Sequence, residues 1–591
     1  MVSYKLSPYA HFIESRLISN ATQYGVFHVL TGEVFEPGQR TRALLFAAKL
    51  GHKISLSNDD LDGLGPDGEQ LRKLIAEELL VTEGSDCLAT FGEHYVVRPL
   101  QNPAVAYRSE KGTMHLVRIS MAERAFSPKP NNRPPIIEEE MPPLAARVFL
   151  GADGTRTLKE ISETCGLASG GNSIEEPAFR AAIEFLAKPE RQLIKLTRQT
   201  ERLNDPYKPF NTVPRNFYHS SRWEEEVRDE DSRSLIDFHQ EGIGNADWEF
   251  DVIEPTINHA FRFSNEALSG MDYGSRFCLC TLKPEILPSL GKADRLNVLE
   301  VGGGTGSFAR AFVEQARRMC ATFGKQMSLN YHILDLAPAL IESQRRMLSG
   351  VSPTVVHFQQ DATELDLPGF EFDLIIANEV IADFPTAEVK HNQAGATNPA
   401  ESRAGIGQQP KWTGAGAQYV EKYGLSIKNA PDSFLVNAGV FKFVERAWKH
   451  LAPGGALVMS EYGGESRYPV EAFHLNHSEF SINFGHVMDC ARKVGFQCHL
   501  QTLKDFINLD DRVSMLSGSN EHIQCLNHVF EKYGTSLPFG LISEREFRSR
   551  FQELATRIEL CGVSFTPLLN NFHYGPNIDD FMVLILKKPA V

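Results

Sequence analysis

The sequence predicts an α/β protein whose main domain is a Rossmann-like, doubly wound sheet, preceded by smaller α+β accessory domains. The chain has 591 residues, which is more than one hydrophobic core usually holds, so two or three domains are expected. After about residue 205, short apolar runs alternate with helical patterns, as they do in parallel βαβ units. A glycine-dense turn, Gly302–Gly306, follows one of these runs directly.

The main domain is expected to cover residues 205–591. Its short β-rich runs predict strands at Arg295–Glu300, Ser328–Asp335, Thr354–Phe358, Phe372–Ala377, Ala456–Glu461 and Phe581–Leu586. We expect Phe581–Leu586 to be the last strand added to the sheet. Lys390–Gly416 is rich in Gly, Ala, Asn and Pro and has no apolar period, which predicts a flexible insertion that could serve as a lid. The insertion is placed near 386–440, and a helical insertion near 505–575.

Residues 1–127 are expected to form an α+β accessory domain. Asn58, Asp59 and Asp60 offer side-chain acceptors for the start of a helix. The other expected elements are a strand at Gly25–Leu30, a turn at Thr31-Gly32, and helices at Thr41–Leu50 and Gly68–Leu80.

Residues 128–204 are expected to form a second accessory domain that is winged-helix-like. Pro128–Pro135 contains four prolines, which is typical of a linker or an extended arm. The pattern then predicts helices at Pro143–Leu150, Thr157–Cys165 and Phe179–Ala187, a turn at Asp153-Gly154, and a short strand at Gln192–Leu196.

This second region resembles the peptide-binding recognition domains of the pyrroloquinoline-quinone D (PqqD) type, found in enzymes that modify ribosomal peptides. The resemblance covers Pro143–Leu196, and its matching pieces are Ala145–Phe149 before Asp153-Gly154, Thr157-Leu158 with Ile161, and Leu193-Ile194. It implies that the region recognises a peptide. A helical accessory domain without a peptide role remains an equal alternative.

Composition narrows the classes of function. The formal net charge is −15, which argues against broad nucleic-acid binding, because neutralising phosphates requires an excess of Lys and Arg. No segment is long and apolar enough to cross a bilayer, and Met1–Ala21 lacks the apolar core of a signal peptide. We therefore expect a cytoplasmic protein that binds neither membranes nor nucleic acids. The sequence leaves the oligomeric state open, with a homodimer as one option.

Cysteine and histidine spacing does not predict a metal site. The nine cysteines are spread through the chain, and only Cys278 and Cys280 lie close together. A lone Cys-x-Cys is weak as a metal motif, so we expect reduced, buried cysteines. His474, His477 and His486 fall within a short span without a compact ligand motif, so a structural or substrate-contact role is expected, with one of them as a candidate proton acceptor.

The strand Leu296–Val301 runs into a turn that suits a nucleotide-like ligand. Gly302, Gly304 and Gly306 would let the backbone pass close beneath a ligand, in conformations that a Cβ forbids. Dinucleotide-binding enzymes share such turns, so the glycines alone do not decide the ligand.

Acidic residues at successive strand ends make the ligand more specific. Glu300 precedes the turn, Asp335 ends the second strand before Leu336, and Asp361-Ala362 follow the third. This order of acid, glycine turn, acid and acid resembles class I methyltransferases, whose cofactor is S-adenosylmethionine. The resemblance implies that Glu300 attracts the positive groups of the methionine part, Asp335 binds the ribose hydroxyls, and Asp361 and Ala362 bind the adenine. Ligands of open α/β sheets bind at these carboxyl ends.

The segment after the fourth strand would face the transferable methyl group. It contains Asn378, Glu379 and Asp383, which we expect to act as the catalytic residues, with Asn378 also near the cofactor. Carboxylates there suit an acceptor nitrogen, because they orient N–H groups and stabilise the positive charge that develops on nitrogen. If Val380–Phe384 forms a helical turn, Glu379 and Asp383 share one face. Tyr273 could cover the cofactor, although a core aromatic residue is the more common case.

The same region resembles the MidA family, methyltransferases related to the mitochondrial complex I assembly factor that methylates a protein arginine. The matching pieces are Ile376–Glu379, Asp383 with Pro385, Gly454–Leu457 before Glu461–Gly463, and the run from His477 to Val487. The chain departs from the family at Glu461, where an aspartate is usual, and in the long insertion after Pro385. The resemblance implies methylation of a nitrogen on a protein.

Three functions remain open from the sequence. The first is an N-methyltransferase that acts on a protein or ribosomal peptide side chain, Arg, Asn or a similar nitrogen. The second is a small-molecule O-methyltransferase of natural-product biosynthesis, although no Leu-His-Asp-Trp-like segment supplies its catalytic histidine. The third is a non-catalytic assembly factor with this fold. A DNA amino-methyltransferase is disfavoured, because Asn378–Ile381 lacks the Pro-Pro-aromatic platform for a flipped base.

Overall fold

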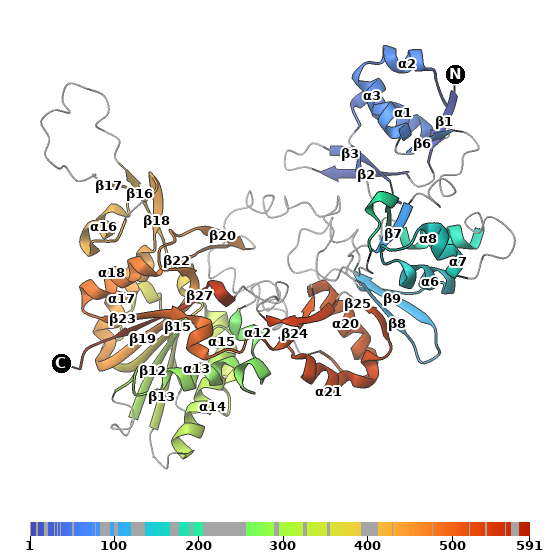
Figure 1. Ribbon diagram of the computed structural model, residues 1–591. Helices are drawn as coiled ribbons and strands as arrows, with labels where there is room; N and C mark the ends of the chain where they lie inside the picture. Colours follow the sequence, from blue (N-terminus) through green and yellow to red (C-terminus); the bar gives the residue numbers. More distant parts are fainter. Residues whose placement is uncertain are drawn as a thin grey trace, which may run out of the picture. The chain divides into compact units, whose positions relative to one another are not determined.

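The computed structural model divides the chain into two compact units (Figure 1). One unit combines Met1–Glu226 with Leu516–Pro538 and Glu544–Phe565, and the other combines Val227–Met515 with Phe539–Ser543 and Thr566–Val591. The structure describes residues 2–590 except 8–9, 17–21, 29, 32–33, 36, 50–52, 77–78, 83–94, 100–103, 120–135, 166–176, 188–190, 192, 205–255, 289–294, 323–327, 352–354, 392–411, 428–429, 475–476, 519, 538–540, 562 and 569–577.

The first unit begins with a small α+β layer around a three-stranded antiparallel sheet of order β5-β1-β6. Leu45, Leu71 and Leu74 pack in its core. Ser57, one residue before the expected acceptors, caps α2 in a capping box with Asp60. The expected helix Gly68–Leu80 ends earlier than predicted, because Leu80 already belongs to a strand. The elements are β1 Val2–Leu6, β2 Ala10–Arg16, β3 Thr22–His28, β4 Val34–Phe35, α1 Gln39–Lys49, β5 Ile54–Leu56, α2 Asn58–Gly63, α3 Pro66–Ala76 and β6 Leu80–Thr82.

Three helices and a strand pair follow in the same unit. Phe149, Phe179 and Ile183 are buried in their common core, as expected from the apolar faces of these helices. The helices are α6 Pro143–Gly151, α7 Leu158–Thr164 and α8 Pro177–Ala187, and the paired strands are β7 Tyr95–Pro99 and β11 Ile194–Arg198. The predicted linker Pro128–Pro135 lies outside the described residues.

A late part of the chain completes this first unit. The strand β25, Ile558–Cys561, pairs with β8, Ala104–Arg108, in the sheet β10-β9-β8-β25. The domain boundary expected from sequence differs here, since the sequence pattern places residues 516–538 and 544–565 in the main domain. Strand pairing between residues distant in sequence leaves no local pattern, which explains the difference. The remaining elements are β9 Met114–Ile119, β10 Ile136–Glu140, α20 Asn520–Lys532 and α21 Glu544–Ala555.

The second unit contains the doubly wound sheet, in the order β14-β13-β12-β15-β19-β27-β23 (Figure 1). Strands β14, β13, β12, β15 and β19 pair in parallel, and β27 is antiparallel to both of its neighbours. The last strand of the chain therefore lies inside the sheet, and β23 forms the edge, a strand that the sequence pattern does not mark. The strands are β12 Arg295–Val301, β13 Ser328–Asp335, β14 Val355–Gln359, β15 Phe372–Asn378, β19 Leu451–Gly464, β23 Gln497–Thr502 and β27 Phe581–Lys587.

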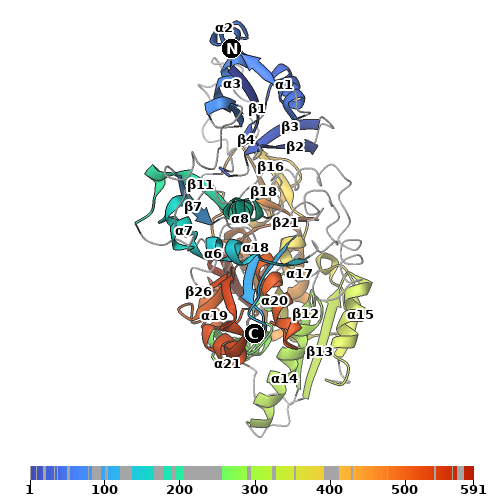
Figure 2. The same ribbon diagram turned by 90° about the vertical axis from the view of Figure 1, so that its right-hand side faces the viewer.

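Apolar side chains cover both faces of this sheet, as buried parallel strands require. On one face Leu299, Ile375 and Leu457 share a core with α17, Ala438–His450, and α18, Phe484–Val494. On the other face the strand residue Tyr331 packs on Phe312 of α14, Ser307–Thr322, at 5.6 Å between ring centroids. Helices α13, Tyr273–Thr281, and α14 also pack together. The helix α15, Pro338–Met347, follows β13 and packs against it (Figure 2).

The expected insertion after Pro385 contains strands and a helix among its described residues. β16 Ala387–His391 lies between β17 Trp412–Thr413 and β18 Ser433–Val436 in a small antiparallel sheet, next to α16 Ala417–Tyr423. Both ends of the predicted flexible stretch are therefore strands, and residues 392–411 lie outside the described part. Across the described residues, no helix is long and apolar enough to span a membrane.

Candidate active site

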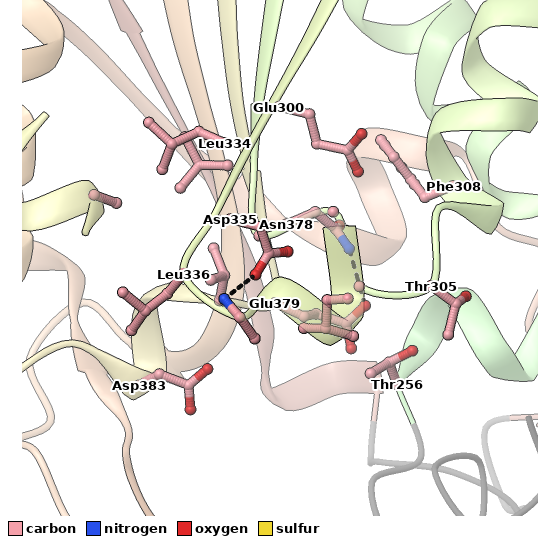
Figure 3. A pocket seen from close by; sticks show the side chains of 18 of the residues that line it. Thr256, Glu300, Thr305, Phe308, Leu334, Asp335, Leu336, Asn378, Glu379 and Asp383 are labelled. Carbon is pink, nitrogen blue, oxygen red and sulfur yellow. Dashed lines mark hydrogen bonds between the residues drawn. The ribbon is translucent and has the colours of Figure 1, made fainter. Parts of the chain in front are cut away.

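A pocket of about 280 Å³ opens at the carboxyl ends of β12, β13, β14 and β15 (Figure 3). This is the edge at which open α/β sheets bind ligands. Residues from the four strand ends and from a segment before the sheet line it: Thr256, Asn258, His259, Glu300–Thr305, Ser307, Phe308, Leu334–Ala337, Leu340, Gln360–Thr363, Asn378–Val380 and Asp383–Pro385. The pocket thus gathers every predicted site residue except Gly306.

The glycine turn forms the floor of the pocket in left-handed backbone conformations. The φ angles are +70° at Gly302 and +49° at Gly304, where residues with a Cβ are strained. A Cβ on Gly304 would meet no atom within 4 Å, so the backbone here borders open space. Gly306 serves packing instead, since a Cβ on it would lie 3.0 Å from the Cα of Gln344 in α15.

Asp335 and Asp361 both turn a carboxylate toward nearby backbone. Asp335 accepts from the Ala337 N–H at 3.1 Å (Figure 3) and from the Gln344 amide at 2.8 Å, and burial raises its pKa to about 6. Asp361 accepts from the N–H of Thr363 at 2.8 Å, as a helix cap does. Ala362 and Leu336 line the pocket beside them.

Glu300 lies deep in the pocket, with 2% of its surface exposed. It accepts a hydrogen bond of 2.9 Å from the Tyr331 hydroxyl. Burial nevertheless raises its pKa to about 8, so the carboxyl is mostly protonated at neutral pH. Glu300 can therefore attract the positive groups of a ligand only if a nearby cation lowers its pKa and the carboxyl loses its proton.

Asn378 is held at the end of β15 by two hydroxyl groups. The Tyr273 hydroxyl and the Ser460 hydroxyl each donate to its Oδ1 at 2.7 Å, which leaves its amide nitrogen to donate to Glu379 at 3.2 Å. Tyr273 is fully buried and does not line the pocket, so it is a core residue that orients Asn378.

The sequence spacing predicts that Glu379 and Asp383 share one helical face, and this prediction is wrong. It has a φ of +51°, and its N–H donates to the Ser460 carbonyl at 2.9 Å. Its carboxylate accepts from the N–H groups of Ile257 at 2.7 Å and Asn258 at 3.4 Å. The carboxylate therefore caps a helix far upstream, α12, Ile257–Ala260. Burial raises the pKa of Glu379 to about 7.

Asp383 lies on a short 3-10 turn, η6, Ile381–Asp383. The buried side chain of Glu461 supports this turn. Glu461 of β19 accepts from the Ala382 N–H at 3.3 Å and from its neighbour Tyr462 at 3.0 Å. Burial, with Glu379 and Asp383 nearby, raises the pKa of Glu461 well above its usual range. The sequence marks Glu461 only as a departure from a family pattern. The fold places it next to Asn378–Pro385, the segment that begins at the end of β15, which we call the acceptor edge.

The pocket also contains residues that the sequence does not point to. Thr256, Asn258 and His259 enter it from α12, and the only local signal is a Thr able to cap a short helix. His486 lies elsewhere, buried and bonded through Nε2 to the Ser426 carbonyl at 3.2 Å. His474 and His477 are paired in the strand register of a hairpin of β20, Glu471–His474, and β21, His477–Phe480.

The donor set of the pocket suits S-adenosylmethionine. A glycine floor leaves room for a ligand, and acids stand at three strand ends where its positive and hydroxyl groups would lie. The sheet order and this site together define a class I methyltransferase-like fold.

Residues 279–480 match a family described as "Putative S-adenosyl-L-methionine-dependent methyltransferase". The chain is accordingly an S-adenosylmethionine-dependent methyltransferase, and S-adenosylmethionine is its cofactor. The match spans about a third of the chain and includes the glycine turn and the acceptor edge. No curated protein matches the chain in sequence.

Several solved structures are similar to the chain. An uncharacterized protein from Burkholderia thailandensis is 15% identical, with a TM-score of 0.32, over 62% of this chain and 86% of that one. A protein of the same superfamily and organism, bound to S-adenosyl-homocysteine, is 15% identical, with a TM-score of 0.32, over 57% of this chain and 86% of that one. A glycopeptide N-methyltransferase in complex with S-adenosylmethionine is 13% identical, with a TM-score of 0.23, over 39% of this chain and 89% of that one.

The Asp335→Ala variant is expected to bind S-adenosylmethionine about 5- to 150-fold more weakly, a loss of roughly 1–3 kcal/mol from charge-assisted hydrogen bonds to ribose. Because the pKa of Asp335 is about 6, the wild type should also lose affinity as the pH falls below that value, and the variant should lose this dependence. Calorimetry from pH 5 to 8 measures both. Equal affinities in a folded variant would remove Asp335 from the site.

Proposed function

We propose that the chain methylates a nitrogen atom on a protein or ribosomal peptide side chain, such as Arg or Asn. The charge of the pocket carries this proposal. Five acids line it, Glu300, Asp335, Asp361, Glu379 and Asp383, and its described lining includes no Lys or Arg. Glu300, Asp335 and Asp361 stand at the strand ends where the cofactor would lie, and Glu379 caps α12, so Asp383 is the carboxylate that we assign to the acceptor. A carboxylate there favours an acceptor that becomes positive as it is methylated, because the developing charge is stabilised where it forms.

In this proposal, the residues at and beside the acceptor edge have different roles in binding and orienting the methyl acceptor. Asp383 lines the pocket on the η6 turn, where its carboxylate would accept an N–H of the acceptor and turn the nitrogen lone pair toward the methyl group. Glu461 fixes that turn through the Ala382 N–H. The bound cofactor supplies a methyl group activated by its sulfonium. Phe384 and Pro385 supply apolar wall at the same edge, which excludes water.

A labelling assay with single-nucleophile peptides tests the proposal. Purified full-length protein is incubated with methyl-tritiated S-adenosylmethionine and otherwise identical peptides that carry one Arg, Asn, Lys or His. Matched peptides with one Ser or Tyr, and simple phenols, serve as controls. Label is expected on a nitrogen peptide. Label confined to hydroxyl acceptors would favour the O-methyltransferase alternative, and no label on any acceptor in a protein that binds the cofactor would favour a non-catalytic assembly factor.

We further propose that residues 128–204 form a peptide-recognition domain. Its support is the packing of α6, α7 and α8 beside the β7–β11 strand pair, although β7, Tyr95–Pro99, comes from before residue 128. Because β25 completes a sheet of the first unit, deleting residues 1–200 would leave that strand without its partner. Hydrogen exchange on the full chain avoids this problem. An acceptor peptide should protect amides within Pro143–Arg198, and unchanged exchange there would contradict a recognition role.

A further inference from the structure

The helix α12 forms one wall of the cofactor pocket although it lies outside the sheet. Thr256, Asn258 and His259 line the pocket from this helix, and only 5% of the His259 surface remains exposed. Thr256 caps the helix by accepting the His259 N–H at 3.1 Å. A helix of four residues has too few internal hydrogen bonds to be stable alone, so its position must depend on outside contacts.

Glu379 provides the contact at the start of α12. Its two carboxylate oxygens accept from Ile257 at 2.7 Å and Asn258 at 3.4 Å. The first N–H groups of a helix lack partners within the helix, and a carboxylate there also interacts favourably with the helix dipole. The Glu379 side chain therefore accepts hydrogen bonds from the first N–H groups of α12 and also places a negative charge at the positive end of its dipole.

The backbone of Glu379 is held in place for this contact. It is one of few described non-glycine residues with positive φ, at +51°, a conformation that usually needs compensation from its surroundings. The Ser460 carbonyl accepts its N–H at 2.9 Å, and the Asn378 amide donates to its carboxylate at 3.2 Å. These bonds tie the carboxylate to the ends of β15 and β19.

A second contact joins α12 to the glycine turn. The Asn258 side-chain amide donates to the Ser307 hydroxyl at 2.9 Å, and Ser307 begins the helix that follows the turn. Hence α12 bridges the acceptor edge at Glu379 and the cofactor floor at Ser307.

We propose that Glu379 is a positioning residue whose carboxylate holds α12 against the pocket, so that Asn258 and His259 stay in its wall when cofactor binds. Glu379 then acts through α12 and not by contact with the methyl acceptor. The proposal rests on the cofactor pocket alone and is independent of which atom is methylated.

Two substitutions at Glu379 separate the loss of the hydrogen-bond acceptor from the loss of charge. Glu379→Gly removes the carboxylate and suits the positive φ, whereas Glu379→Gln keeps a hydrogen-bond acceptor and removes the charge. In the Gly variant, amide exchange at Ile257 and Asn258 should rise about 10-fold or more, and S-adenosyl-homocysteine should bind about 10-fold more weakly. In the Gln variant the single amide oxygen can accept from Ile257 but not also from Asn258 and Asn378, so both quantities should lie between those of wild type and the Gly variant.

Two matched control variants isolate the effect of the Glu379 carboxylate. Asn508 also has a positive φ, +50°, and does not line the pocket, so Asn508→Gly measures the effect of glycine alone and should leave Ile257 exchange and ligand affinity unchanged. Asp383→Ala removes another pocket carboxylate and should leave Ile257 exchange unchanged. Wild-type exchange at Ile257 in Glu379→Gly would overturn the proposal, as would exchange at Ile257 that rises equally in Asp383→Ala. Because S-adenosyl-homocysteine is the probe, neither outcome depends on a nitrogen acceptor.

Discussion

Replacing Gly302 by alanine is expected to weaken S-adenosylmethionine binding by about 100-fold or more. The φ of Gly302 is +70°, a conformation that costs a residue with a Cβ about 1–2 kcal/mol. The new Cβ would also lie 2.4 Å from Cγ2 of Val380, a pocket residue, and such crowding typically costs about 1–3 kcal/mol. The turn would relieve these costs by moving away from its binding shape, and restoring that shape on binding would take about 2–5 kcal/mol. Since each 1.4 kcal/mol is tenfold in affinity, this reaches about 100-fold.

Two other glycines separate crowding from backbone strain. Gly304 has a φ of +49°, and a Cβ added there would have no atom within 4 Å; Gly350 has a φ of +81° with equally open surroundings outside the pocket. Gly304→Ala should weaken binding about 10-fold by strain in the floor, whereas Gly350→Ala should lower the melting temperature without changing affinity. Calorimetry and thermal unfolding measure these effects, and near-wild-type binding by Gly302→Ala would place the cofactor elsewhere.

The Asp383→Asn variant is expected to lower the rate of methyl transfer about 100-fold, the size typical of a lost electrostatic or acid–base group. Asparagine preserves the shape of the side chain and removes its charge, so cofactor affinity should change by less than about 3-fold. Single-turnover kinetics, with saturating cofactor and a nitrogen peptide from the labelling assay, measures the effect on the chemical step.

The exposed Asp366 gives the matched control for this substitution. It follows η5, Ala362–Glu364, close to the site in sequence but outside the pocket lining. Asp366→Asn should therefore retain the wild-type rate. If Asp383→Asn also turns over at the wild-type rate, Asp383 is not the residue that aligns the acceptor, and a nitrogen acceptor loses its main support in the pocket.

Local patterns predict the centre of the main domain well. The strand Ser328–Asp335 has the predicted bounds, and the bounds of β12, β14, β15 and β27 differ from the prediction by one residue. The strand β19 is longer than the predicted Ala456–Glu461, because it runs from Leu451 to Gly464. Apart from the edge strand β14, these strands are largely buried, so their apolar runs are continuous and easily recognised. The strand β23 is missed, because Gln497–Thr502 is the sheet edge and carries polar residues on its exposed positions.

The identity of a side chain does not reveal its partner. The spacing of Glu379 and Asp383 predicts a shared helical face, but a positive φ at Glu379 breaks the helical spacing. In the sequence Glu461 is only an exchange of one acid for another, and its support of the η6 turn becomes visible only with β15 and β19 aligned. The contact of Glu379 with α12 and the contact of Glu461 with Ala382 each join segments distant in sequence. A single sequence carries no periodic signal for such contacts.

The sequence by itself determined the class of fold, the glycine turn and the acids at three strand ends, because each depends on residues close together along the chain. Only the tertiary structure decided which distant segment completes the pocket and which late segment belongs to the first unit. The helix α12 reaches it through Glu379, 122 positions later in the chain, and β25 leaves the C-terminal part to pair with β8 in the first unit. Hydrogen bonds and burial between distant segments set these features, and such contacts follow from the packing of the whole chain.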